Sequence, residues 1–505
     1  MNRTASIKQF MVDNHKVFYM KFTHQLQSLR KARLYRVFIS SIAFILCMQH
    51  SVSAIADNYN EAMQSDKGNW QPLFNGKDFD GWQKINGEAD YLIEDGVIVG
   101  VSKLNTPNTF LRTEKTYSDF ILEYDIWVDN NLNSGVQIRS NTDPDYRNGV
   151  VHGYQVEADP SPRAFTAGIY DEQRRGWIYP VTENKNAKHA FINGGWNTIR
   201  VEAIGNSIKT WLNGHMITRL VDDATAQGFI ALQVHSIREA SQEGAKVRWR
   251  NLRIMTDDLE ANQWPNDPDV REISYLTNTL TDWEKRHGYR LLFNGESSEG
   301  WMGAKLDDFP KSGWTIKDGI LSVEETDGGE STGPGDIITE QKFSNFELHV
   351  DFKYTEGANS GIKYFVDPEL NKGPGSAIGL EFQILDDEKH PDAKNGVAGN
   401  RTLASLYDLI TAENLSHDNS SKQRYAKGPG EWNRARVVVK DGKIEHWLNN
   451  VKMVEFDRNS QMFTALVNYS KYKDWPNFGR LPQGHILLQD HGNLVHFKNI
   501  KIKEM

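Results

Sequence analysis

The stretch 379–386 (GLEFQILD) carries two carboxylates and an amide at spacings that suit proton-transfer chemistry. In an extended strand Glu381 and Gln383 lie on one face, whereas Phe382 and Ile384 point into the core. Asp386 reaches the polar face only if a bulge intervenes. Because carboxylates act as general bases and acids, Glu381 and Asp386 are candidate catalytic residues, and Gln383 is a candidate binding residue. An ordinary solvated sheet face is the alternative.

A second run, 484–492 (GHILLQDHG), ends in a polar pair. Strand alternation puts Gln489 and His491 on one face. Histidine is the natural base near neutral pH. We therefore interpret His491 as a third candidate catalytic residue and Gln489 as a binding residue. The alternative is that His491 closes the strand end by bonding to the backbone.

The first half of the chain repeats both runs with altered residues. The segment 154–159 (YQVEAD) exchanges the amide and the acid of the 379–386 run, and 232–235 (LQVH) aligns with 488–491. This predicts a second set of ligand-binding side chains, namely Gln155, Glu157, Gln233 and His235.

Further candidates lie around an Asn-Ser-Gly sequence that occurs in both halves. Asn359 in the second copy favours a turn and offers hydrogen bonds to a ligand. Past the turn the first copy has Arg139, whereas the second has Phe365 there and Lys363 two residues earlier. We expect Arg139 and Lys363 to bind substrate. The difference leaves open which half keeps a full site.

Aromatic side chains in loops are candidates for stacking on a ligand, because loops on a rigid scaffold often carry function. Tyr407 follows a Ser-Leu pair, and Trp475 lies in an insertion at about 460–483. Both are predicted to contact substrate. No cluster has zinc-ligand spacing, and no cofactor is indicated. Whether the chain binds a structural calcium ion is left open.

Composition excludes several classes of protein. With 11% aromatic residues and 14 Trp the chain is too aromatic to be mainly disordered. A lone cysteine, Cys47, excludes an intrachain disulfide and a multi-cysteine metal site. The net charge is −9, and 1–56 holds eight Lys and Arg against one Asp, so the remainder is more acidic still. Nucleic acid and anionic membrane surfaces are therefore poor candidate partners.

The N-terminal region has the order of an export signal. A basic stretch at 30–36 precedes the apolar run 37–48 (VFISSIAFILCM), and small residues follow it. The run is shorter than a membrane span requires, so stable membrane insertion is not expected after cleavage near Ala54 or Ala56. We predict export to the periplasm or the cell exterior. A short membrane anchor is the alternative.

An internal repeat organises the rest of the chain. Six groups recur in the same order, namely LFNG with GW, a turn Asp-Gly, Asn-Ser-Gly, Trp-Asn, Trp-Leu-Asn and Leu-Gln-x-His. Within each copy apolar residues alternate with polar ones, as at 120–128 and 346–352, which indicates half-buried strands. Asp441-Gly442 is a strong hairpin signal. The pattern predicts an all-β chain with two antiparallel sandwiches or jelly rolls in tandem.

The connector differs from both copies. Val270, Ile273, Leu276, Leu280 and Trp283 recur at helical spacing, which predicts a helical linker. The expected organisation is therefore a signal segment at 1–56, a first sandwich at 57–256, a linker at 257–288 and a second sandwich at 289–505. We expect the two sandwiches to fold separately.

The ordered motifs resemble the 3-keto-disaccharide hydrolase family, whose newer description is 3-keto-glucoside 1,2-lyase with 3-keto-2-hydroxy-glucal hydratase activity. The resemblance covers about 70–256 and 289–505. It implies a secreted protein with a fold like concanavalin A and the laminarinase-type glycosidases, in which two curved sheets carry a carbohydrate cleft. It also implies cleavage of an oligosaccharide or glycoside already oxidised to a ketone at C3.

Such chemistry needs a base for the acidic C2 proton, an acid for the departing C1 oxygen and donors for the C3 enolate. The hypothesis is that Glu381 or His491 is the base, Asp386 or a water is the acid, and Gln383, Gln489 or Lys363 steadies the enolate. This places the chemistry in the second copy. The alternatives are a tandem carbohydrate-binding protein without catalysis, or one catalytic and one binding copy.

Overall fold

The computed structural model describes residues 68–184, 186–326, 335–416 and 420–505. The predicted signal segment 1–56 and the start of the first predicted domain lie outside these residues. Asn69–Ala261 and Asn266–Met505 together form one compact unit. Within the described residues no helix is both long and apolar enough to cross a membrane.

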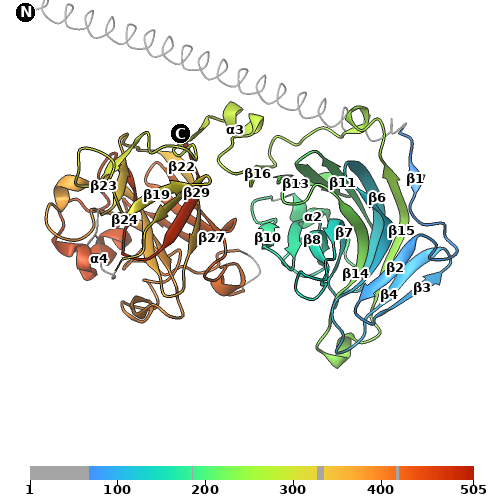
Figure 1. Cartoon of the computed structure of the whole chain (residues 1–505). Coiled ribbons are helices and arrows are strands. Elements are labelled where there is room, and N and C mark those ends of the chain that lie inside the picture. Colours follow the sequence, from blue (N-terminus) through green and yellow to red (C-terminus); the bar gives the residue numbers. More distant parts are fainter. Residues whose placement is uncertain (1–67, 185, 327–334, 417–419) are drawn as a thin grey trace, which may run out of the picture. The chain divides into compact units, whose positions relative to one another are not determined.

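The first half forms an antiparallel sandwich of two sheets (Figure 1). One sheet has the order β16-β13-β12-β11-β6-β15-β4-β3, with β1 paired to β15, and the other has the order β10-β9-β8-β7-β14-β5-β2. The strand bounds are β1 Gln71–Pro72, β2 Trp82–Asn86, β3 Asp90–Glu94, β4 Val97–Val101, β5 Thr109–Tyr117, β6 Phe120–Val128, β7 Ser134–Asn141, β8 His152–Ala158, β9 Ile169–Glu172, β10 Gly176–Tyr179, β11 Asn197–Ile204, β12 Ser207–Leu212, β13 His215–Val221, β14 Gly228–Val234, β15 Lys246–Met255 and β16 Glu272–Ser274.

The second half is also an antiparallel sandwich. Its larger sheet has the order β19-β20-β29-β22-β25-β26-β27, with β17 paired to β29, and the smaller has the order β18-β21-β28-β23-β24. The strand bounds are β17 Tyr289–Leu291, β18 Trp301–Gly303, β19 Trp314–Lys317, β20 Ile320–Val323, β21 Ile337–Thr339, β22 Phe346–Tyr354, β23 Asn359–Asp367, β24 Ile378–Leu385, β25 Asn433–Lys440, β26 Lys443–Leu448, β27 Val451–Asp457, β28 His485–Leu488 and β29 Val495–Glu504.

Helices in the described part of the chain are short. They are α2 Ala187–Ala190, α3 Asp282–Arg286, α4 Gln461–Tyr469, and the 3₁₀ helices η1 Ala240–Gln242, η2 Glu260–Asn262, η3 Pro368–Leu370, η4 Pro391–Lys394, η5 Lys422–Arg424 and η6 Lys471–Asp474. The prediction of an all-β tandem is confirmed.

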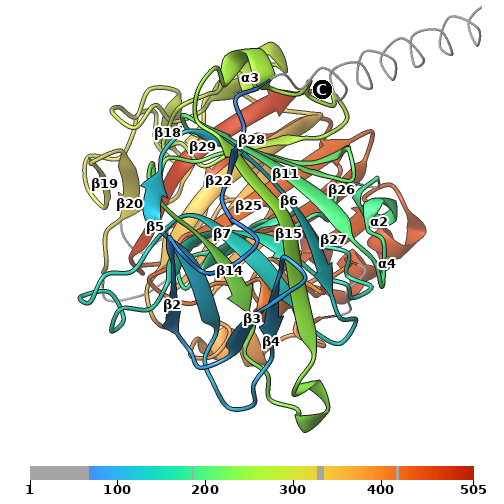
Figure 2. The same ribbon diagram turned by 90° about the vertical axis from the view of Figure 1, so that its right-hand side faces the viewer.

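The predicted alternation of apolar and polar residues is present in the strands that form the core. Every second residue of β6, from Phe120 to Val128, lies in the hydrophobic core, and β22 behaves in the same way. Figure 2 looks onto the sheet that contains β11, β6 and β15, behind which lie β7 and β14. The predicted hairpin is also confirmed, because Asp441 and Gly442 join β25 to β26 with φ values of 52° and 85°. Positive φ at both central residues suits the right-handed twist of the strands.

The helical linker prediction is wrong for most of its length. Ile273 lies in β16, which pairs in parallel with β13 opposite Leu220. The edge of β13 therefore supplies the backbone hydrogen-bond partners that a helix would otherwise provide for itself. The helix α3 begins only after Thr281, whose side chain and Glu284 form a capping box. Tertiary pairing thus overrides the helical spacing of the apolar residues.

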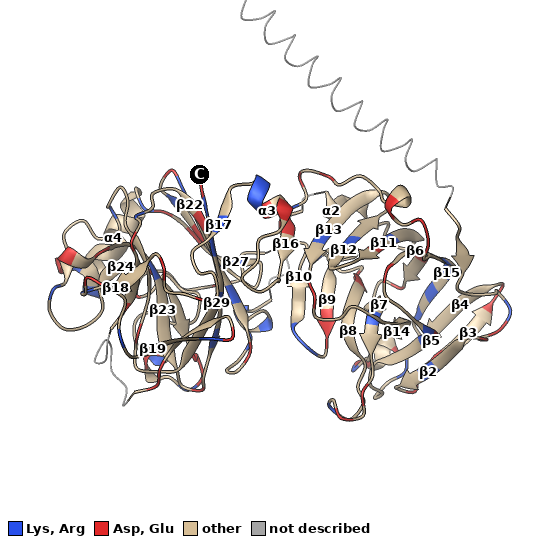
Figure 3. Cartoon of the chain, turned by 45° about the horizontal axis from the view of Figure 1, so that its top comes forward, with Lys and Arg blue, Asp and Glu red and all other residues tan. Residues whose placement is uncertain are grey.

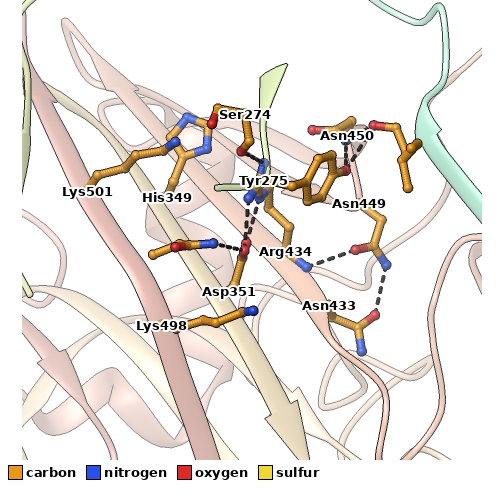
Figure 4. Close-up of polar contacts among 12 residues, drawn as sticks. Ser274, Tyr275, His349, Asp351, Asn433, Arg434, Asn449, Asn450, Lys498 and Lys501 are labelled. Atoms are coloured by element: carbon orange, nitrogen blue, oxygen red, sulfur yellow. Dashed lines mark hydrogen bonds and ion pairs between the residues drawn. The ribbon is translucent and has the colours of Figure 1, made fainter. Parts of the chain in front are cut away.

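The linker is anchored on the second sandwich by a buried ion pair (Figure 4). Arg434 on β25 donates to Asp351 on β22 through Nε at 2.6 Å and Nη2 at 2.9 Å. Its Nη1 donates to the carbonyl oxygen of Ser274 at 2.8 Å. The guanidinium also lies 4.1 Å from the ring centroid of Tyr275. Only 3% of the Arg434 side chain and 6% of the Asp351 side chain are exposed.

Removing the charge of Asp351 should therefore destabilise the chain strongly. Asp351→Asn leaves the buried Arg434 without its counterion, and we expect the free energy of unfolding to fall by about 3–5 kcal/mol. Chemical denaturation measures the change. Lys285→Gln is the control, because Lys285 and Asp282 form an ion pair whose side chains are 62% and 83% exposed. The control should cost less than about 1 kcal/mol, and equal losses for both variants would contradict the argument.

Candidate active site

The polar face of β24 forms the floor of a pocket of about 320 Å³ in the second sandwich. Glu381 and Gln383 stand on β24, Asn359 begins the neighbouring strand β23, and Gln489 and His491 follow the end of β28. Phe382 and Ile384, on the opposite face of the strand, are core residues, as the alternation predicted. Loop residues complete the lining, namely His390, Pro391, Asp392, Asn395, Tyr407 and Lys471.

Glu381 is buried, and a cation lies beside it. The register of β23 and β24 places Lys363 opposite Glu381. The Nζ atom of Lys363 lies 3.8 Å from Oε2 of Glu381. A buried carboxylate is costly unless an opposite charge or hydrogen bonds compensate it. The pairing therefore favours the ionised form of Glu381, which is the form that a general base needs.

The neighbouring amide fixes the orientation of Glu381. With its nitrogen facing its acceptors, the Gln383 side chain lies 3.1 Å from Oε1 of Glu381 and 3.2 Å from the carbonyl oxygen of Ser360. The backbone N–H of Tyr407 donates to the carbonyl oxygen of Glu381 at 3.1 Å. The carboxylate is thus held by strands and loop together.

Asp392 holds the loop that forms one wall. Its carboxylate accepts hydrogen bonds from Tyr407 Oη at 2.7 Å, Arg401 Nη1 at 2.8 Å and Asn395 Nδ2 at 3.1 Å. Burial opposes ionisation, but these bonds outweigh it and lower the pKa of Asp392. Burial and the bond to Asp392 raise the pKa of Tyr407. Tyr407 therefore stays protonated, and Lys471 Nζ lies 4.4 Å from its ring centroid.

Two imidazoles face each other in the pocket. The ring centroids of His390 and His491 are 6.0 Å apart. Burial, with the charge of His491 as a smaller cause, lowers the pKa of His390. The backbone N–H of Asp392 donates to Nδ1 of His390 at 3.2 Å. Imidazole groups can take up or release a proton near neutral pH, so this pair places proton-transfer groups on the pocket wall.

The pocket unites many of the predicted residues of the second half, which are Asn359, Glu381, Gln383, Tyr407, Gln489 and His491. Lys363 and Trp475 instead line a neighbouring pocket of about 190 Å³, and Lys471 lines both pockets. Lys363 also donates to Ser376 Oγ, so its ammonium lies behind Glu381 within the sheet.

Asp386 does not line either pocket, because β24 ends at Leu385 and no bulge turns Asp386 to the polar face. Its carboxylate accepts backbone hydrogen bonds from Gly357 at 2.8 Å, Glu388 at 3.1 Å and Lys389 at 3.2 Å. The residue organises the turn that follows the strand. The geometry gives no support to the predicted role as a general acid.

Sequence reasoning missed His390, Asp392 and Lys471. They lie in loops, which have no periodicity that could mark a common face. The one available signal was an imidazole and a carboxylate two residues apart, just beyond the candidate strand.

The first sandwich has a larger pocket of about 1040 Å³, which Gln155, Glu157 and His235 line as predicted. Gln233 is buried beside this pocket's strands but does not line it. Arg139 does not line it either. Its guanidinium donates to the carbonyl oxygens of Ser118 at 2.6 Å and Gly205 at 2.7 Å, and to Asp119 at 2.9 Å.

The position of Arg139 explains why the comparison of the two copies led to the wrong prediction that Arg139 binds substrate. Arg139 has a φ of 44° and its counterpart Phe365 a φ of 53°, and both lie where the strand register shifts. Such a bulge re-aims the side chain. In the first sandwich the re-aimed Arg139 ties strand connections together, so its role is structural.

The comparison with known proteins agrees with this architecture. The family profile described as a 3-keto-alpha-glucoside-1,2-lyase-like domain matches residues 69–255 and 288–503. The chain belongs to this family. It carries the domain twice, and the family resemblance of the ordered motifs is confirmed.

Relatives of this chain include a curated protein and solved structures. A 3-keto-disaccharide hydrolase of Bacteroides thetaiotaomicron is 36% identical over 236 residues, which are 43% of this chain and 78% of that protein. A crystal structure from Parabacteroides distasonis, provisionally named a glycosyl hydrolase, is 32% identical with a TM-score of 0.39. The match covers 45% of this chain and 99% of that one.

The charges and donor groups of the described residues bear on possible ligands. No group of three or more His, Cys, Asp or Glu side chains in this part of the chain could hold a metal ion. Basic and acidic residues are interspersed along the elements drawn in Figure 3. Residues of both signs also line the pocket of each sandwich.

The position of Asp386 leads to a prediction about stability. Asp386→Ala removes the acceptor of three backbone N–H groups, so we expect a loss of about 1–3 kcal/mol in the free energy of unfolding. The folded fraction should keep its activity. Glu388→Ala, on the exposed part of the same turn, is the control. A drop in rate of about 10² or more at unchanged stability would instead identify Asp386 as the general acid.

Proposed function

We propose that the chain cleaves glycosides carrying a ketone at C3, and that the second sandwich performs the chemistry. The observation that carries the proposal is the buried Glu381–Lys363 pair at the floor of a pocket lined by two imidazoles, a protonated Tyr407 and the Lys471 ammonium. It combines an ionised carboxylate with nearby proton donors. The family and the name of the Bacteroides thetaiotaomicron relative support a carbohydrate hydrolase.

The first step is an elimination. Glu381 takes the C2 proton, which the C3 ketone makes acidic, and the electron pair of that bond forms the C1–C2 double bond. The C1–O bond to the aglycone breaks with its electron pair on oxygen, and protonated His491 supplies the proton to this oxygen. Gln489 and Lys471 offer donors for the C3 oxygen as its charge develops.

The second step is a hydration. Water adds its hydroxyl group to C1 and a proton to C2, so the sum of both steps is hydrolysis. The carboxyl group of Glu381 holds the proton taken in the first step and can return one to C2. His491, now neutral, can activate the water.

A carbohydrate-binding protein without catalysis is the second candidate. The observation that favours it is the mixture of amides and aromatic side chains in both pockets. We favour the enzyme because a binding protein has no need of a buried carboxylate paired with a lysine, which is costly to maintain.

Replacing the proposed base should abolish most of the activity. Glu381→Gln keeps the shape but cannot accept a proton, so we expect cleavage of a 3-keto-glucoside to slow by at least about 10²-fold. Product release, followed by chromatography and mass spectrometry, measures the rate. Glu388→Gln is the matched control, and the unoxidised glucoside is the substrate control.

The outcomes separate the alternatives. In D₂O the carboxyl proton of Glu381 exchanges with the solvent between the two steps, so elimination and hydration leave deuterium at C2 of the product, whereas direct displacement leaves hydrogen there. This interpretation requires that substrate recovered at partial conversion carries no deuterium at C2, because exchange in the substrate would also label the product. Loss of activity in Glu157→Gln with a normal Glu381→Gln would move the chemistry to the first sandwich. Binding without turnover in the wild type would favour the carbohydrate-binding protein.

We also propose that the protein acts outside the cytoplasm. The support is the basic, apolar and small-residue order at 30–56, which is typical of export signals. Mass spectrometry of protein from the periplasm or culture medium should find a chain that begins between about 53 and 57. Exported material that retains 37–48 would contradict cleavage.

A further inference from the structure

The first-sandwich pocket is built on the strands that match those of the candidate active site, but its charges are arranged differently. In the second sandwich Lys363 lies opposite Glu381. At the equivalent place in the first sandwich Gln137 lies opposite Gln155. Gln137 Nε2 donates to Gln155 Oε1 at 2.7 Å. An ion pair is thus replaced by a neutral pair of amides, and the base of the second pocket has no counterpart.

The acid of the first pocket, Glu157, has different surroundings from Glu381. Only 3% of Glu157 is exposed, and it accepts hydrogen bonds from Asn133 at 2.5 Å and Gln155 at 3.0 Å. Its nearest cation, Arg163, is 3.4 Å away and bonds more closely, at 2.7 Å, to Asp159. One guanidinium therefore serves two carboxylates.

This sharing affects the protonation of Glu157. Burial raises the pKa of Glu157 to about 7, and the charge of Arg163 only partly offsets the burial. The charged and titratable groups around it come from five elements. They are Arg163 and Asp159 from the loop after β8, Tyr170 and Glu172 from β9, His235 from the end of β14, Arg238 and Glu239 from the segment that follows, and Arg424 from η5 of the second half. At neutral pH a large fraction of Glu157 is protonated. In that form its carboxyl group donates a hydrogen bond.

An aromatic wall adjoins this carboxyl group. Tyr170 and Trp177 both line the pocket, with ring centroids 5.2 Å apart, and the partly exposed Tyr170 is the accessible ring because Trp177 is only 7% exposed and packs in the core. The Arg163 guanidinium lies 5.0 Å from the Trp177 ring centroid and is nine-tenths buried. Its Nη1 atom has no hydrogen-bond partner within the described residues. A wall of rings beside donors and acceptors suits a ligand with apolar C–H faces and many hydroxyl groups.

The charges and the size narrow the class of ligand. Acidic and basic side chains both line the pocket, namely Glu157, Asp159, Glu172 and Glu239 with Arg163, Arg238 and Arg424. This mixture does not favour a strongly anionic ligand. The volume of about 1040 Å³, against about 320 Å³ in the second sandwich, accommodates a longer chain.

We propose that the pocket of the first sandwich is a separate, non-catalytic site for a neutral oligosaccharide, with Glu157 as a hydrogen-bond donor and Tyr170 as the stacking surface. The site anchors a glucan chain while the second sandwich acts on an oxidised unit. The binding itself does not depend on the proposed cleavage reaction.

Calorimetric titration of the full chain tests this site. The probes are maltotetraose and cellotetraose, and all variants carry Glu381→Gln so that turnover at the second site does not interfere. We expect one of the two probes to bind. Because donation needs protonated Glu157, the affinity should fall about tenfold between pH 6 and pH 8. Tyr170→Ala should weaken binding by at least about tenfold.

Glu157→Gln makes the test specific. An amide always donates, so this variant should bind at pH 8 at least as well as at pH 6, whereas Glu114→Gln, an exposed control in the same sandwich, should keep the wild-type pH dependence. Absence of binding by both probes at millimolar concentration overturns the proposal. Binding that survives Tyr170→Ala, or cleavage that Glu157→Gln abolishes in an otherwise wild-type chain, also overturns it. Binding by a chain that cleaves no 3-keto-glucoside would refute only the proposed function.

Discussion

The register between β23 and β24 is the constraint on which the candidate active site depends. It places Lys363 opposite Glu381 and Gly361 opposite Gln383. A Cβ atom at Gly361 would lie 2.2 Å from Oε1 of Glu381, so only glycine lets this carboxylate lie across the neighbouring strand. The first sandwich uses the same device, because a Cβ at Gly135 would lie 2.6 Å from Cγ of Gln155. If the register slipped by one residue, the side chains of Lys363, Glu381 and Gln383 would turn from the polar face of the sheet into the core.

Given that register, the charges determine what each pocket can do. In the second sandwich Lys363 bonds to Ser376, whose hydroxyl donates to Asp336 at 2.5 Å, so the buried lysine lies between two carboxylates. Burial raises the pKa of Asp336, and the positive charge of Lys363 partly offsets this rise. In the first sandwich amides occupy the corresponding positions, and the acid is displaced along its strand. Exchange of one amide and one acid thus replaces a carboxylate that lies beside a lysine with one that shares its arginine with a second acid.

The sequence predicted those features that depend on local pattern. Alternation located the strands and the polar face of β24, since side chains in a strand point to opposite faces regardless of context. It could not show that β24 ends before Asp386, that Arg139 lies on a bulge, or that Ile273 joins the edge of β13. Each of these depends on a partner distant in the chain. The walls of the pocket escaped prediction for the same reason, because His390, Asp392 and Lys471 are brought together only by folded loops.

One connection differs greatly in length between the two sandwiches. In the first sandwich 222–227 joins β13 to β14, whereas in the second 458–484 joins β27 to β28 and contains α4 and η6. This longer connection places Lys471 over Tyr407, and the backbone N–H of Lys471 donates to Asp408 at 3.0 Å. The insertion thus adds a cation to the lining of the second pocket. A pocket of about 320 Å³ suits the chemistry on one sugar unit that we propose for the second sandwich, and a pocket of about 1040 Å³ suits the longer chain that we propose for the first. The same pair of sheets would thus serve two purposes through the loops that it carries.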